Sequence, residues 1–200
     1  TQALDGSFAV FYLVHSMSAT NKDFASADRQ AAQNLVRAAE KNQVQRLFYL
    51  GGLGEKSSHL SHHLSSRLEV GEILESSSIP LTWLRAAVIL GSGSASFELV
   101  RYLVDRLPLL VTPKWVRTLS QPISIRNVLD YLVGCLQNPD TAGKRFDIGG
   151  PDILSYEDLF RIYAQEAGLP RRIIIPIPLL SPRLSSYWIN LITPVPVSLA

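Results

Sequence analysis

The sequence lacks the features that would tie the chain together covalently or carry it through a membrane. It has one cysteine, Cys135, so no internal disulfide can form, and a reducing compartment, the cytoplasm, is expected. No uninterrupted apolar run reaches the roughly 18 residues that a membrane span needs. The basic residues are scattered and the formal net charge is only +2. A nucleic-acid partner needs basic residues clustered on one face, so none is expected.

A further absence concerns chemistry. No tyrosine in the chain is followed four residues later by lysine. A phenol held beside a lysine ammonium is a common proton donor for hydride transfer to a carbonyl. Any chemistry of that kind must therefore use a different proton donor here, or the chain is not catalytic.

What is present predicts an α/β fold. Hydrophobic residues make up 46% of the chain, enough for a substantial core. Continuous apolar runs at 8–14 and 44–50 are typical of strands buried on both faces of a parallel sheet, and 81–86 predicts another. Helical spacing occupies 23–42 and 60–76. Strands that alternate with helices in this way favour a parallel sheet with right-handed crossovers.

The pattern is looser beyond Gly91. Further elements are predicted as follows: helices over 95–106 and 127–138, and short strands over 109–112, 122–125 and 145–148. Ser155 should cap another helix, with Asp158 at its third position. The segment from Pro170 onward holds six of the twelve prolines, which rule out a spanning helix. Its apolar stretch at 187–192 is expected to dock a further domain or subunit, with membrane attachment as the alternative.

Several segments occur together in one order: 12–17, 46–53, 64–74, 84–97, 121–123 and 146–152. As an ordered set they resemble the atypical short-chain dehydrogenases/reductases of the NmrA-like, NAD(P)-binding kind, and most closely the bacterial YbjT-like proteins. The resemblance implies a Rossmann-like, doubly wound parallel sheet in a single domain over 1–200, truncated at its N-terminus. It also implies that 92–126 and 150–200 contribute a small substrate lobe and a C-terminal extension.

The same resemblance implies NAD or NADP as the cofactor. The family's glycine-rich phosphate turn should precede Thr1, and so should the acidic or basic residue after the second strand that selects NAD or NADP, so this sequence leaves both cofactors open. The ends of three strands, together with one helix residue, should contact the cofactor: His15, Ser16, Met17, Gly51, Gly52, Leu53, Ala86, Ala87, Val88 and Arg67. Gly51 and Gly52 stand where the family's dehydrogenases carry their catalytic serine, so that hydroxyl is also absent.

On the second predicted helix, alignment with the family places His63 at its tyrosine and Arg67 at its lysine. Arginine can still donate hydrogen bonds to ribose hydroxyls. His63 could donate a proton, or it could be an ordinary histidine at a helix start. With His59 and His62 it has the spacing of a metal site, but no cysteine or clear carboxylate partner accompanies the three histidines. His15 could contact cofactor or substrate, or be structural.

Ser96, Phe97 and Gln121 are the candidate substrate contacts. The loop 91–96 resembles a phosphate cradle but lacks the lysine of a P-loop, so a flexible entry to the next helix is the simpler interpretation. Arg85 ends a buried strand and should have an ion-pair partner. Cys135 lies among apolar residues and should belong to the core.

Two functions remain open. The first is an NAD(P)H-dependent reductase of a small apolar carbonyl, enone or quinone-like compound, with orientation supplying much of the rate. The second is a non-catalytic nucleotide-binding module, either a redox sensor or an assembly partner, as the loss of the tyrosine, lysine and serine together suggests. An epimerase or dehydratase is a third possibility, which the missing tyrosine disfavours.

Overall fold

The structure, a computed structural model, describes residues 2–14, 24–54 and 61–177. Two compact units make up the chain: residues 1–87 with 126–148, and residues 88–125 with 149–200. Several predicted features lie outside the described residues: His15, Ser16, Met17, His59 and the apolar stretch 187–192. No helix among the described residues is long and apolar enough to cross a membrane.

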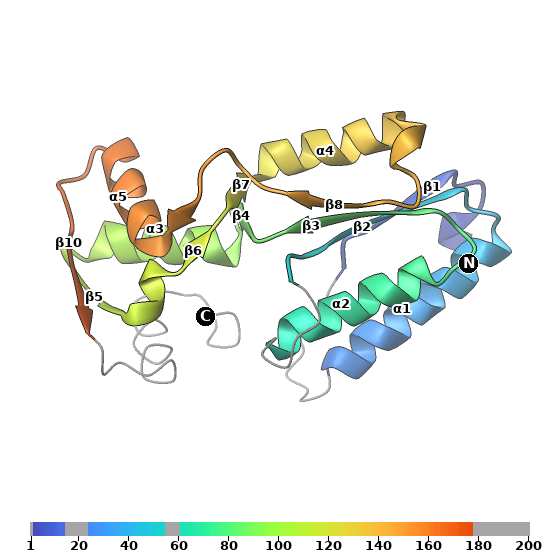
Figure 1. Cartoon of the computed structure of the whole chain (residues 1–200), viewed down its shortest axis with the longest axis horizontal. Coiled ribbons are helices and arrows are strands. Elements are labelled where there is room, and N and C mark those ends of the chain that lie inside the picture. Colours follow the sequence, from blue (N-terminus) through green and yellow to red (C-terminus); the bar gives the residue numbers. More distant parts are fainter. Residues whose placement is uncertain (1, 15–23, 55–60, 178–200) are drawn as a thin grey trace. The chain divides into compact units, whose positions relative to one another are not determined.

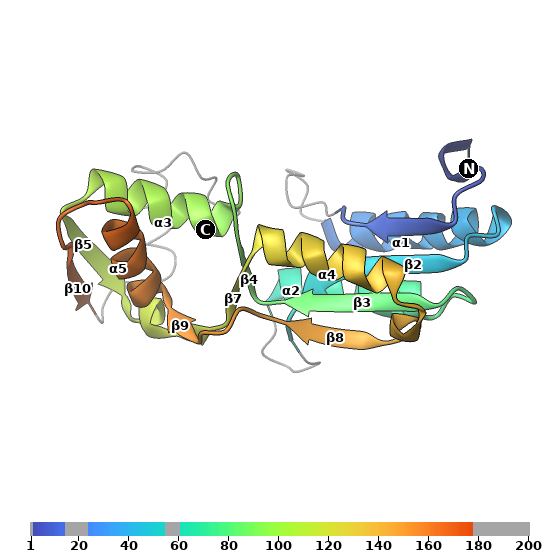
Figure 2. The same ribbon diagram turned by 90° about the horizontal axis from the view of Figure 1, so that it is seen from above.

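The first unit is built on a parallel sheet with helices on both faces. Its strands, in the spatial order β1-β2-β3-β8, are β1 (Ala9–Tyr12), β2 (Arg46–Gly52), β3 (Leu81–Ala86) and β8 (Arg145–Ile148). Helices α1 (Phe24–Lys41) and α2 (His62–Glu75) cover one face, and α4 (Ile125–Gln137) lies on the other (Figures 1 and 2). Short 3-10 turns complete the unit, η1 (Gln2–Leu4) and η3 (Pro139–Thr141). This arrangement confirms the predicted Rossmann-like fold class.

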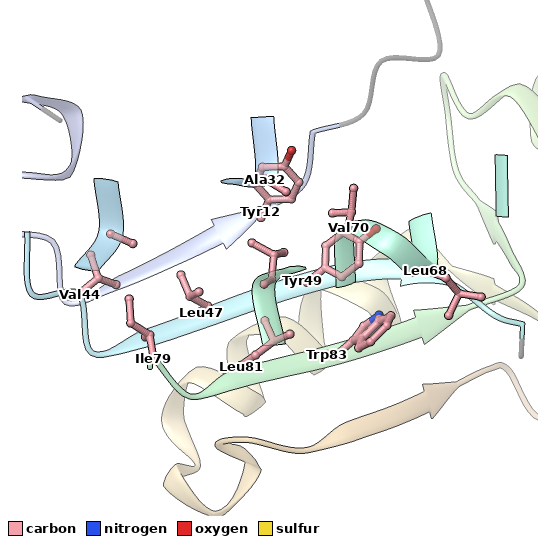
Figure 3. Packing of buried hydrophobic residues seen from close by; sticks show 12 residues of the cluster. Tyr12, Ala32, Val44, Leu47, Tyr49, Leu68, Val70, Ile79, Leu81 and Trp83 are labelled. Carbon is pink, nitrogen blue, oxygen red and sulfur yellow. The ribbon is translucent and has the colours of Figure 1, made fainter. Parts of the chain in front are cut away.

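The main core of this unit lies between the sheet and the helices α1 and α2. Leu47 and Tyr49 of β2 and Trp83 of β3 point into it (Figure 3), and all three are almost fully buried. A Cβ atom added at Gly71 of α2 would stand only 2.2 Å from Cζ2 of Trp83. Helix α2 therefore packs directly onto the indole ring, which only a residue without a side chain allows at that point.

On the face that carries α4, a buried arginine links the sheet to the helix end. Arg46 is 8% exposed, and its Nη2 donates to Oγ1 of Thr82 (2.9 Å) and of Thr141 (3.1 Å). The same nitrogen reaches the carbonyl oxygen of Cys135 at 3.4 Å. A cation at the last carbonyl groups of a helix is favourable, because those groups carry partial negative charge. Cys135 itself is buried, as predicted.

In its described residues, the second unit combines two helices with three short two-stranded sheets. The helices are α3 (Ala95–Arg106) and α5 (Tyr156–Glu166). The strand pairs are β4 (Val88–Leu90) with β7 (Pro122–Ser124), β5 (Leu109–Pro113) with β10 (Ile173–Ile177), and β6 (Leu119–Ser120) with β9 (Leu154–Ser155). The first two pairs are parallel and the third is antiparallel. A 3-10 turn, η2 (Lys114–Arg117), follows β5. Apolar residues of α3, α5 and β5 form a core of their own.

The predicted cap of α5 is confirmed as a complete capping box. The Ser155 hydroxyl oxygen accepts from the backbone N–H of Asp158 at 3.1 Å, and the Asp158 carboxylate accepts from the backbone N–H of Ser155 at 2.9 Å. Both bonds satisfy N–H groups that a helix start otherwise leaves unpaired. The Asp158 carboxylate also accepts from the Ser155 hydroxyl at 2.5 Å, and this bond, together with the one from the Ser155 backbone N–H, lowers the pKa of Asp158.

Candidate functional site

The carboxyl ends of β2 and β3 meet in the first unit and form a rim. Gly52 is level with Ala86, and the backbone N–H of Leu53 donates to the carbonyl oxygen of Ala86 at 2.9 Å. Leu53 is 39% exposed and Ala87 is also exposed, whereas Ala86 is buried. The structure thus brings together the candidates from these two strands. Ligands of open α/β sheets bind beyond such strand ends.

The two glycines that end β2 have different surroundings. A Cβ atom at Gly51 would meet the indole Nε1 of Trp83 at 2.7 Å, so Gly51 faces the core. A Cβ atom at Gly52 would stand 2.7 Å from a methyl carbon of Leu64 and 3.6 Å from Cδ of Arg67. Leu64 therefore lies over the backbone where a side chain at Gly52 would project. As the structure stands, this part of the rim has an apolar cover and no room for a hydroxyl group.

Helix α2 starts directly above this rim. Ser61 caps it, because its hydroxyl oxygen accepts from the backbone N–H of Leu64 at 3.3 Å. His63 and Arg67 are four residues apart and so share one side of the helix. The Tyr49 hydroxyl donates to the carbonyl oxygen of Arg67 at 2.9 Å, and burial raises the pKa of Tyr49. That phenol is committed to the helix backbone, which excludes it as a ready proton donor.

His63 is packed rather than projecting freely. Its ring stacks on the ring of Phe24 of α1, with centroids 4.7 Å apart and an angle of 19° between the ring planes. Its Nδ1 is buried and has no hydrogen-bond partner among the described residues. These contacts favour the alternative in which His63 is a structural residue at a helix start. Its role as a proton donor stays a prediction.

Arg85 has the ion-pair partner that the sequence analysis expected. Its Nε and Nη2 donate to the two carboxylate oxygens of Asp147 at 2.6 Å and 3.0 Å. The arginine side chain is 17% exposed and the aspartate is 52% exposed. The two-point geometry joins β3 to β8 just below the rim, so Arg85 is a structural residue.

The three candidate substrate contacts, Ser96, Phe97 and Gln121, belong to the second unit. So does Val88, a candidate cofactor contact, which begins β4. Ser96 and Phe97 are in the first turn of α3, but Ser94 is the residue that caps it, accepting from the N–H of Phe97 at 3.2 Å. The Phe97 ring meets the Tyr163 ring edge-on at 6.0 Å. Gln121 donates from Nε2 to the carbonyl oxygen of Gly150 at 2.6 Å, which engages its amide in the fold.

The loop 91–96 is not arranged as a phosphate cradle. The Glu98 carboxylate accepts from the backbone N–H of Gly93 at 3.2 Å and pairs with Arg101 at 2.5 Å. These hydrogen bonds, chiefly the one from Arg101, lower the pKa of Glu98. A carboxylate therefore already occupies the start of α3, where a phosphate would otherwise be attracted. The simpler interpretation, a loop leading into a helix, is the one that the structure supports.

Sequence reasoning missed a shallow cavity of about 590 Å³ beside α4 in the first unit. Its lining residues come from α4, β3 and β8 and the turn between them: Leu84, Asn127, Asp130, Tyr131, Gly134, Cys135, Asn138, Thr141, Phe146, Asp147 and Ile148. No sequence signal marks it, because it depends on how α4 crosses the sheet. No group of three or more metal-ligating side chains occurs in the described part of the chain.

The fold and the rim together define an α/β protein of the open, doubly wound kind. No protein-family profile matches the chain. An NADH dehydrogenase [ubiquinone] 1 alpha subcomplex subunit 9 of Arabidopsis thaliana mitochondria is 24% identical over 162 residues, which are 80% of this chain and 40% of that protein. The chain thus spans less than half of that relative.

Solved structures show the same fold. A nucleoside-diphosphate-sugar epimerase from Staphylococcus aureus superposes with a TM-score of 0.73 at 19% identity, over 94% of this chain and 62% of that one. A short-chain dehydrogenase/reductase superfamily protein from Agrobacterium tumefaciens with bound NAD gives a TM-score of 0.64 at 16% identity, over 88% and 69%. At these identities the likeness establishes the fold of this chain.

Proposed function

We propose that the native protein containing this chain binds NAD or NADP, with the nicotinamide end of the cofactor against the rim of β2 and β3. The observation that carries the proposal is the apolar rim at the ends of β2 and β3, where Leu53 and Ala87 are exposed and Leu64 covers Gly52. A flat aromatic ring fits against such an edge. The NAD-bound neighbour of the same fold and the NmrA-like or YbjT-like sequence pattern support it.

The residues present fit one half of the cofactor. Leu53 and Leu64 would provide apolar contacts for the ring, and the Arg67 guanidinium would donate hydrogen bonds to ribose hydroxyls. A bound reduced nicotinamide supplies hydride. The chain's own contribution is to orient the ring and exclude water, and orientation alone is worth several orders of magnitude in rate. His63 is the residue that we propose as the proton donor.

The activity we propose is that of an oxidoreductase acting on a small apolar carbonyl, enone or quinone-like acceptor, with the second unit as the substrate lobe. Ser96, Phe97 and Gln121 are the proposed contacts there. The apolar cover of Gly52 favours an acceptor that needs no hydroxyl donor at that point.

A second function is favoured by the same cover and by the printed name of the Arabidopsis relative. Leu64 over Gly52 removes the position of a catalytic hydroxyl, and that relative is a subunit of a larger NADH dehydrogenase. A nucleotide-binding module that senses redox state or supports assembly fits both facts.

The test is a calorimetric titration of the native gene product that contains residues 1–200 with NAD⁺, NADH, NADP⁺ and NADPH. Leu53→Glu should weaken binding at least about tenfold, because it places a charge beside an apolar ring and near the cofactor's phosphates. Leu119→Glu, at a residue 66% exposed in the second unit, is the matched control and should bind as the parent does. Binding weaker than about 1 mM for all four nucleotides, or no effect of Leu53→Glu, would refute the proposal.

Turnover separates the two functions. NADH oxidation with a panel of quinones and enones supports the reductase, and a shifted pH profile in His63→Gln identifies the proton donor. Tight NADH binding with no oxidation by any acceptor supports the non-catalytic module.

A further inference from the structure

The two-stranded sheet of β5 and β10 has one face in a core and one face that is partly exposed in the described part of the chain. The strands run parallel, with Ile173 level with Leu109 and Ile177 level with Pro113. Leu110 and Ile174 point inward and pack with residues of α3 and α5. Both helices lie to the same side of these strands (Figure 1). Successive side chains of a strand alternate between faces, so the odd-numbered residues point the other way.

That opposite face, here called the β5–β10 face, is wholly aliphatic apart from Pro113 at its end. Its residues are Leu109 and Val111 of β5 and Ile173, Ile175 and Ile177 of β10. Leu109, Ile173 and Ile175 are 44%, 62% and 45% exposed, and nothing in the described chain covers them. A parallel sheet normally has both faces covered, so this face is suited to an interface.

Two cations lie next to opposite ends of these two strands. Arg171 precedes β10 in the outward-facing register and is exposed, and Lys114 follows β5 and is exposed. Neither makes a hydrogen bond or ion pair in the described structure. Arg172, by contrast, is turned inward and donates from Nε to the carbonyl oxygen of Val104 at 2.9 Å. No acidic residue occurs in 107–115 or 169–177.

The dimensions of the face match one helix. Five residues of strand extend about 16 Å, and two strands with their side chains are about 10 Å wide. A helix of about 11 residues is as long, and its diameter is about 10 Å. A second copy of this chain would bring the same cations against these cations, which disfavours it. Two cations are also fewer than the basic clusters that bind anionic membranes.

We propose that the β5–β10 face binds one amphipathic helix of a partner protein, with its apolar side on the aliphatic residues and carboxylates at its ends beside Arg171 and Lys114. Aliphatic contact supplies the affinity, and the two ion pairs fix the choice of partner. This proposal does not depend on nucleotide binding.

The test uses the whole 200-residue chain and two synthetic helical peptides of about 14 residues, one with glutamates at both ends and one with lysines at the same positions. Fluorescence anisotropy measures the affinity of each peptide for the chain. The glutamate peptide should bind at least about tenfold more tightly than the lysine peptide. Arg171→Glu should remove that preference, and Ile175→Glu should abolish binding. Ile153→Glu, at another aliphatic residue of the same unit that is 65% exposed, should leave it unchanged.

Equal affinities for the two peptides, or no binding of either, would overturn the proposal. So would dimerisation in sedimentation experiments that Ile175→Glu disrupts, since the occupant would then be a second copy. Cosedimentation with vesicles of phosphatidylcholine and phosphatidylserine that depends on Ile175 and Arg171 would assign the face to a membrane surface instead. Because Arg171 is exposed, Arg171→Glu should fold as the parent does, so a change in peptide preference would report on binding and not on misfolding.

Discussion

The closest packing beneath the rim is that of α2 on Trp83, and Gly71→Ala tests it. The new Cβ would stand 2.2, 2.3 and 2.6 Å from three ring atoms of Trp83, whereas carbon atoms in contact prefer about 3.5–4.0 Å. The ring is 1% exposed and packed beside Tyr49, with centroids 5.8 Å apart, so it cannot turn away freely. Helix α2 must therefore shift away from the sheet by about 1 Å or more.

The magnitude follows from two opposing effects. Overpacking a well-filled core costs about 1–3 kcal/mol, and alanine in place of glycine in a helix returns up to about 1 kcal/mol. We expect Gly71→Ala to destabilise the first unit by about 1–2 kcal/mol. Native-state hydrogen exchange of the β2 and β3 amides reports this unit separately from the second.

Two variants make the test specific. Gly134→Ala on α4 is the control, because its Cβ would meet no atom within 4 Å, and it should stabilise by about 0.5–1 kcal/mol. In a Trp83→Phe background, which lacks the outer ring atoms, Gly71→Ala should cost clearly less than it does in the parent. If Gly71→Ala slowed hydrogen exchange of the sheet amides as much as Gly134→Ala does, the inferred close packing of α2 on Trp83 would be wrong.

Three further predictions concern stability. Ser155→Ala removes the cap of α5 and should cost about 1 kcal/mol in urea unfolding, whereas Ser155→Asp should keep most of it. Pairing with Arg145 lowers the pKa of Glu75, so this carboxylate stabilises the fold at neutral pH and that contribution is lost as the pH falls below 4.5. Glu75→Gln should therefore be less stable than the parent at pH 7, with the difference shrinking as the pH falls below 4.5; a difference that does not change with pH would contradict this. Asp147→Asn leaves Arg85 without its carboxylate partner and should lower the free energy of unfolding in urea by about 1–2 kcal/mol. An unchanged free energy of unfolding would show that the pair is only a surface contact.

The elements that the sequence predicted best carry a strong local signal. The strand at 81–86 and the helix at 95–106 have the predicted bounds, because each has a clear apolar pattern within a few residues. The helix cap at Ser155 was also predicted, because it depends on Ser155 and Asp158, which are only three residues apart. The parallel pairing of β1, β2 and β3 followed from the alternation of strands and helices.

What the sequence did not predict depends on contacts distant along the chain. The pairing of β5 with β10 joins residues 64 positions apart (Leu109 with Ile173), and the strands β4, β6 and β9 are too short to show a pattern. The partner of Arg85 could be expected, but not that it would be Asp147.

The candidate site likewise has one part that the sequence could predict and one part that it could not. Backbone positions such as Gly52 and Ala86 are adjacent because parallel strands end together, which a sequence can indicate. The cover of Gly52 by Leu64, and the stacking of His63 on Phe24, arise only when α2 packs on the sheet. These side-chain contacts decide what chemistry the rim allows.

The most direct test of the central claim is a nuclear Overhauser measurement on the native protein with bound NADH and ¹³C-labelled leucine methyl groups. If the nicotinamide lies on the rim of β2 and β3, its ring protons should show contacts to the methyl groups of Leu53 or Leu64. Contacts only to leucines away from this rim, such as Leu81 at the opposite end of β3, would contradict the account.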